Sequence, residues 1–68
     1  MYNKSMQQFF TKETIKTGEI IGLDKDTEYQ LRKVLRANDG YLMRLADING
    51  HIFLCEYRAG KALVKEEL

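Results

Sequence analysis

The pair Asn49-Gly50 separates two stretches that are typical of β-strands, and this pattern constrains the fold more than any other feature of the chain. From Tyr41 to Ala46 the side chains alternate between two faces, and the segment from His51 to Tyr57 forms the returning strand. An Asn-Gly pair readily adopts the positive φ angles that a tight hairpin turn requires. The sequence therefore predicts two strands joined by a hairpin turn in the second half of the chain.

The rest of the chain predicts three further strands and one helix. Short strands are expected at residues 9–10, 19–23 and 62–64, where aromatic and β-branched residues lie between turn residues. Asp24 is expected to cap a helix of about ten residues that stops at Asn38-Asp39-Gly40. The order strand, strand, helix, strand, strand, strand indicates a mainly β fold, a small β-barrel closed over one α-helix.

The length and the cysteine count indicate one small intracellular domain. A chain of 68 residues has room for one domain, and a single cysteine, Cys55, permits no internal disulfide bond. The sequence has no apolar stretch long enough to cross a membrane and no apolar segment typical of a signal peptide. We therefore expect a cytoplasmic protein with no membrane partner, in which residues 1–5 form a flexible lead and residues 6–68 form the domain.

Positive charge is concentrated in the middle of the chain. The formal net charge is only +1, but residues 32–44 hold four cations against Asp39 alone. On a helix, Arg32, Lys33 and Arg36 can project to one side and contact phosphates, or they can simply complement the helix dipole. Arg44 and Arg58 would extend such a phosphate-binding surface.

The sequence offers no set of catalytic, cofactor-binding or metal-binding residues. His51 is the only histidine and Cys55 the only cysteine, so neither a metal cluster nor a nucleophilic triad can be assembled. The five glycines are spaced as turns and form no phosphate-binding loop. The four tyrosines and three phenylalanines could stack on unpaired bases, but most fall on strand positions, where a core this small needs its largest side chains, which favours burial. We therefore expect a binding domain and no enzyme within these residues.

Three segments together resemble the N-terminal domain of the RsmE family, which methylates N3 of a uridine in small-subunit (16S) ribosomal RNA. The segments are Gln8–Phe10, the run LRKVLR at residues 31–36, and LADING at residues 45–50. The sequence departs from the family at Tyr29-Gln30, where the family has two histidines. The resemblance implies a PUA-like β-barrel over residues 6–68 that helps to bind ribosomal RNA.

The resemblance also implies a larger partner domain. Members of this family carry a C-terminal SPOUT domain, which binds S-adenosylmethionine and forms the homodimer, and this domain is absent from the 68 residues. The chain is then expected to be either a piece of a longer methyltransferase or a free-standing relative, without a cofactor of its own. The alternative is a protein-interaction or structural barrel that packs on a partner domain through an exposed apolar patch that includes Leu42, Ile48, Leu63 or Val64.

Overall fold

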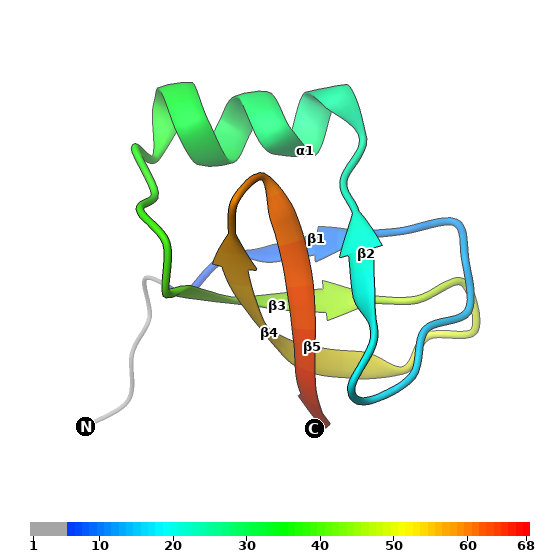
Figure 1. The fold of residues 1–68 in the computed structure, drawn as a ribbon. Helices are drawn as coiled ribbons and strands as arrows, with labels where there is room; N and C mark the ends of the chain where they lie inside the picture. Colours follow the sequence, from blue (N-terminus) through cyan, green and yellow to red (C-terminus); the bar gives the residue numbers. More distant parts are fainter. Residues whose placement is uncertain (1–5) are drawn as a thin grey trace.

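The computed structural model describes residues 6–68, so the expected lead at residues 1–5 lies outside the described residues. Its elements follow the predicted order (Figure 1). They are β1 (Gln8–Phe10), β2 (Ile20–Gly22), α1 (Lys25–Tyr29), the π-helical segment η1 (Gln30–Val34), β3 (Tyr41–Ala46), β4 (Ile52–Arg58) and β5 (Lys61–Glu67). The segments α1 and η1 follow each other directly and form the one expected helix.

The five strands form one curled sheet, and the mainly β class is confirmed. The strand order is β1-β3-β4-β5-β2, with β1 parallel to β3 and all other neighbours antiparallel. A register shift at Leu54/Cys55 interrupts the β4–β5 ladder, and such a bulge bends a strand and increases its twist. In the described part of the chain, β1 and β2 are the two edges and do not pair with each other, so the sheet is a half-barrel.

The predicted hairpin forms between β3 and β4, and Asp47 stabilises its turn. Tyr41 lies opposite Tyr57, and the register continues to Ala46 opposite Ile52. The buried Asp47 carboxylate accepts hydrogen bonds from the backbone N–H groups of Asn49 at 2.9 Å and His51 at 3.0 Å. The hairpin is thus closed by the Asp47 side chain and by the positive φ of 86° at Gly50, whereas Asn49 does not adopt the positive φ that the sequence predicted for it.

The core lies on the concave face of the sheet, and the helix covers one end of it (Figure 1). Alternation places Met43, Leu45, Phe53 and Cys55 inward, as their burial shows. Leu31 adds the fully buried side chain from the helix. The buried cluster is Ile15, Leu31, Met43, Leu45, Phe53, Cys55, Tyr57, Ala62 and Val64.

The helix begins where the sequence predicted but ends earlier than predicted. Asp24 caps the start, as expected, and accepts a hydrogen bond from the Thr27 backbone N–H at 2.7 Å. The predicted stop at residues 38–40 is wrong, because the helix ends at Val34 and Arg36 adopts a left-handed φ of 54°. The wide π-helical turn brings the Leu35 N–H to the Gln30 carbonyl at 2.8 Å, and the chain then leaves the helix axis at Arg36.

Candidate nucleic-acid interface

The helix presents positive charge next to an exposed aromatic ring. Lys25, Tyr29, Arg32 and Lys33 are exposed and, with the half-buried Glu28, line one hollow of about 220 Å³. The sequence predicted Arg32 and Lys33 but missed Lys25 and Tyr29. The spacing of four residues from Lys25 to Tyr29 and from Tyr29 to Lys33 is the signal that could have found them.

Arg36 does not extend this face in the way the sequence predicted. The prediction placed it one helical turn beyond Arg32, on the same side of a continuous helix. Its left-handed backbone places it after the end of η1, so helical spacing no longer relates it to Arg32. Its side chain is exposed, and its predicted RNA contact stays a prediction.

Arg44 lies on another surface of the domain. It occupies the convex face of β3, between Gln8 of β1 and Leu54 of β4 in the sheet register. Its Nε is buried and has no hydrogen-bond partner among residues 6–68. The structure therefore does not bring Arg44 together with the cations of the helix.

Arg58 is held by a carboxylate of its own strand. Its Nε donates to Glu56 Oε2 at 3.0 Å, and its Nη2 contacts the same oxygen. Lys65 Nζ lies 3.3 Å from the other oxygen of Glu56. The hydrogen bond from Arg58 and, to a smaller extent, the hydrogen bond from Lys65 lower the pKa of the Glu56 carboxyl. Arg58 is therefore less available to a phosphate than the helix cations are.

A second, larger hollow of about 640 Å³ lies beside the helix and is polar. The Tyr57 hydroxyl donates to Glu28 Oε2 at 3.3 Å, and Arg32 Nη1 lies 3.8 Å from the same oxygen. Glu28 and Arg32 also line the hollow that contains Tyr29, so these two side chains are shared by both hollows. Asp39 and Ala59 also line this hollow, and Asp39 Oδ1 accepts a hydrogen bond from the Ala59 N–H at 2.9 Å.

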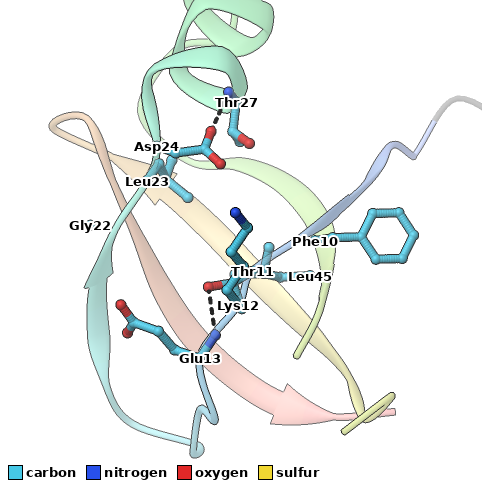
Figure 2. Close-up of a pocket in the computed structure, with 9 residues that line it drawn as sticks. All are labelled: Phe10, Thr11, Lys12, Glu13, Gly22, Leu23, Asp24, Thr27 and Leu45. Atoms are coloured by element: carbon cyan, nitrogen blue, oxygen red, sulfur yellow. Dashed lines mark hydrogen bonds between the residues drawn. The ribbon is translucent and has the colours of Figure 1, made fainter. Parts of the chain in front are cut away.

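A third cavity of about 360 Å³ lies at the open side of the half-barrel, between β1, β2 and the start of the helix (Figure 2). Its charged side chains are Lys12, Glu13 and Asp24. Asp24 already caps the helix, and its hydrogen bonds with Thr27 lower its pKa. The Phe10 ring points away from this cavity in Figure 2. The Asp24 carboxylate therefore has a structural role here.

The described residues carry no arrangement suited to metal or thiol chemistry. Within residues 6–68, no three His, Cys, Asp or Glu side chains are grouped so that they could hold a metal ion. Cys55 is buried, and burial raises the pKa of its thiol to about 11, so it is protonated at neutral pH. Over the same residues, no helix has the length and apolar character needed to span a membrane.

Comparison with known proteins gives a likeness of fold. No family model matches the sequence, and no curated protein matches it. Among solved structures, the chain is similar to the presumed methyltransferase Lpg2936 from Legionella pneumophila, solved in complex with its bound cofactor SAM. The TM-score is 0.81 at 13% identity over 93% of this chain, which establishes a shared fold. The chain spans 28% of the length of that protein.

Proposed function

We propose that this chain is an RNA-binding accessory domain of a methyltransferase that uses S-adenosylmethionine. The observation that carries the proposal is the exposed helix face, where Lys25, Arg32 and Lys33 surround one hollow. The likeness of fold to a region of a SAM-bound protein supports the methyltransferase context. In this role the domain positions RNA, and the rest of the enzyme supplies the methyl donor and the catalytic groups.

The cations of this face are free enough to exchange their partners for phosphates. In the described part of the chain, Lys25 and Lys33 take part in no ion pair, and Arg32 has only the long contact to Glu28. The Arg32 side chain is 61% exposed, and ion pairs between exposed side chains contribute about 1 kcal/mol or less. A phosphate with two accessible oxygens can therefore replace Glu28 as the partner of Arg32 at little cost.

The finer part of the proposal follows the resemblance to the RsmE family. The RNA would be small-subunit ribosomal RNA, and the modified atom would be N3 of a uridine. The chain would work beside a SPOUT domain that binds S-adenosylmethionine and forms a homodimer. The helix segment at residues 31–36, which carries much of the resemblance, includes two of the cations of the exposed face.

The test is an RNA titration with charge-matched variants. Wild type, Arg32→Gln/Lys33→Gln and the control Lys16→Gln/Lys65→Gln are titrated with a small-subunit ribosomal RNA fragment at several salt concentrations. Both double variants lose two positive charges, but only the first loses them on the helix face. We expect the first to bind more weakly and with a shallower salt dependence, because fewer counterions are released. Equal binding by both double variants, or no binding by wild type at low salt, contradicts the proposal.

A second candidate function is a protein-interaction module, favoured by the convex face of the sheet. Ile20 and Leu63 are paired across β2 and β5, and Ile20 is 66% exposed. Of the other residues expected in an apolar patch, Leu42 and Ile48 are exposed, but Val64 is buried in the core, so its assignment to the patch is wrong. Its place on β5 points it inward.

The apolar row on this face is interrupted. Glu56 lies between Leu63 and Leu42 in the sheet register, and its carboxylate binds Arg58 and Lys65 there. A docked apolar surface would have to bury that ion network, which costs free energy. Concentration-dependent self-association in sedimentation, removed by Ile20→Lys, would favour this second function over RNA binding.

A further inference from the structure

We infer that the helix face binds single-stranded RNA by stacking one unpaired base on the ring of Tyr29, with Lys25 and Lys33 contacting the phosphates on either side. This inference rests on the proposed function and deepens it. It names the form of RNA and the residue that receives the base. In this inference the contacts of Glu28 with Tyr57 and Arg32 hold the helix face in position.

The Tyr29 side chain is exposed and does not belong to the buried core. The helix contributes Leu31 and Thr27 to the buried interior, and Leu35 packs partly against the core. Tyr29 points elsewhere and is 60% exposed. An aromatic ring that covers no core offers a flat apolar surface to solvent, and such a surface is what a nucleobase needs for stacking.

The charges around the ring fit a nucleic-acid backbone. Lys25 and Lys33 each lie four residues from Tyr29, one towards each end of the helix, and both line the same hollow as the ring. Eight residues of α-helix rise about 12 Å along the axis, and the π-helical turn of η1 makes the separation of the two Cα atoms somewhat smaller than this. A strand that lays one base on the ring therefore has a cation available for its backbone on each side.

The carboxylate of Glu28 in this hollow already has partners within the fold. Glu28 Oε2 accepts the hydrogen bond from Tyr57 and faces Arg32. A Cβ on Gly60 would lie 2.9 Å from the same oxygen, so the absence of a side chain at Gly60 leaves room for this position. Tyr57 thus holds one oxygen of Glu28, and among residues 6–68 neither Lys25 nor Lys33 forms an ion pair with this carboxylate.

Stacking on one exposed ring selects single-stranded over duplex RNA. In a duplex every base is already stacked on its neighbours and paired, so a ring on a helix surface cannot reach its face. An unpaired base loses little by moving onto the ring. Lysine contacts alone would make no such distinction, because both forms of RNA present phosphates.

The experiment compares a labelled 12-nucleotide single strand with a duplex of the same length, by fluorescence anisotropy over a range of salt concentrations. The proteins are the 68-residue chain, Tyr29→Ala, Tyr29→Phe and Lys33→Gln. We expect Tyr29→Ala to weaken binding of the single strand by about five-fold or more, with an unchanged salt slope. Tyr29→Phe should bind nearly as wild type does. Lys33→Gln should lower the salt slope, since one phosphate contact is lost.

The outcomes separate this inference from the proposed function. Equal single-strand binding by wild type and Tyr29→Ala, with Lys33→Gln still weakened, overturns the stacking inference and leaves RNA binding intact. Equal affinity of wild type for the duplex and the single strand overturns it as well. No binding of either RNA by wild type at low salt overturns the proposed function. Because Tyr29 is exposed, the Tyr29→Ala chain should keep the circular dichroism spectrum of the wild type.

Discussion

The Tyr57 hydroxyl donates a hydrogen bond to the Glu28 carboxylate, with 3.3 Å between Oη and Oε2. This contact joins the end of β4 to the helix across 29 positions of sequence. It fixes one side of the helix face that we propose for RNA, because Arg32 contacts the same carboxylate.

Replacement of Tyr57 by Phe should destabilise the fold modestly. The ring stays in the core, and only the hydrogen bond to Glu28 is lost, which costs about 0.5–1.5 kcal/mol of unfolding free energy. Denaturation in urea measures the change. Tyr41→Phe is the matched control, since Tyr41 lies opposite Tyr57 in the β3–β4 register. A loss in the control as large as the loss in Tyr57→Phe would assign the effect to the strand pair and not to the helix contact.

Stability in acid should depend on Asp47. Burial raises the pKa of its carboxyl, but the backbone hydrogen bonds from His51, Asn49 and Ile15 outweigh burial and leave the pKa lowered from 3.8. A group with a lowered folded-state pKa adds stability above its unfolded pKa and loses it as pH falls through the folded value. The free energy of unfolding should therefore drop below pH 3.8 more steeply in wild type than in Asp47→Asn.

The control for the acid series is Glu67→Gln, which removes an exposed carboxylate at the end of β5. This variant should keep the acid dependence of wild type. Asp47→Asn should also be less stable at neutral pH, because an amide accepts hydrogen bonds more weakly than a carboxylate. Identical pH profiles for wild type and Asp47→Asn would refute the role assigned to the turn.

The Cys55 thiol should be unreactive in the folded chain. It is fully buried, and burial raises its pKa from 9.0 to about 11. At pH 8 a disulfide reagent should label it only after unfolding in guanidinium. The raised pKa also means that its contribution to stability is present below pH 9.0 and is lost as pH rises through about 11.

The alkaline loss of stability should shrink in Cys55→Val, which has a side chain of similar size and no proton to release. Part of the loss of stability above pH 10 should remain in this variant. Burial and, to a smaller extent, the charge of Glu28 raise the pKa of the Tyr57 hydroxyl above 10.0. Rapid labelling of the folded wild type at pH 8 would contradict the burial of Cys55.

Arg36→Gly should stabilise the chain. Arg36 has a φ of 54°, and the left-handed conformation costs an ordinary residue about 1–2 kcal/mol, which glycine avoids. Glycine also loses more backbone entropy on folding, so we expect a net gain of about 0.5–1 kcal/mol in urea denaturation. Arg36→Ala is the control and should bring no gain, since alanine keeps the Cβ. A loss of stability in Arg36→Gly would contradict the assigned helix end.

The sequence predicted the elements of this fold well because each has a local signal. Asp24 caps the helix, Asn49-Gly50 marks the hairpin turn, and alternation marks β3. No local signal predicts how the edge strands of the sheet pair, because the parallel pairing of β1 with β3 joins residues about 36 positions apart. The helix end was predicted wrongly because a left-handed arginine has no characteristic sequence, whereas glycine in that conformation is expected.

The candidate interface was predicted only in part. Adjacent cations in the sequence drew attention to Arg32 and Lys33, but the face also includes Lys25 and Tyr29, which lie one or two turns earlier. Arg58 and Glu56 are two positions apart on a strand and so share a face, and this spacing could have signalled their ion pair. The contact between Glu28 and Tyr57 depends on the tertiary fold and could not be read from the sequence.

The central claim is that the helix face, and not the convex face of the sheet, receives RNA. The most direct measurement is a two-dimensional ¹⁵N NMR titration of the chain with a single-stranded RNA. We predict that the backbone amide signals of residues 25–34 shift most. The largest shifts at Ile20, Leu42 and Leu63 of the convex face, with residues 25–34 unchanged, would contradict the claim.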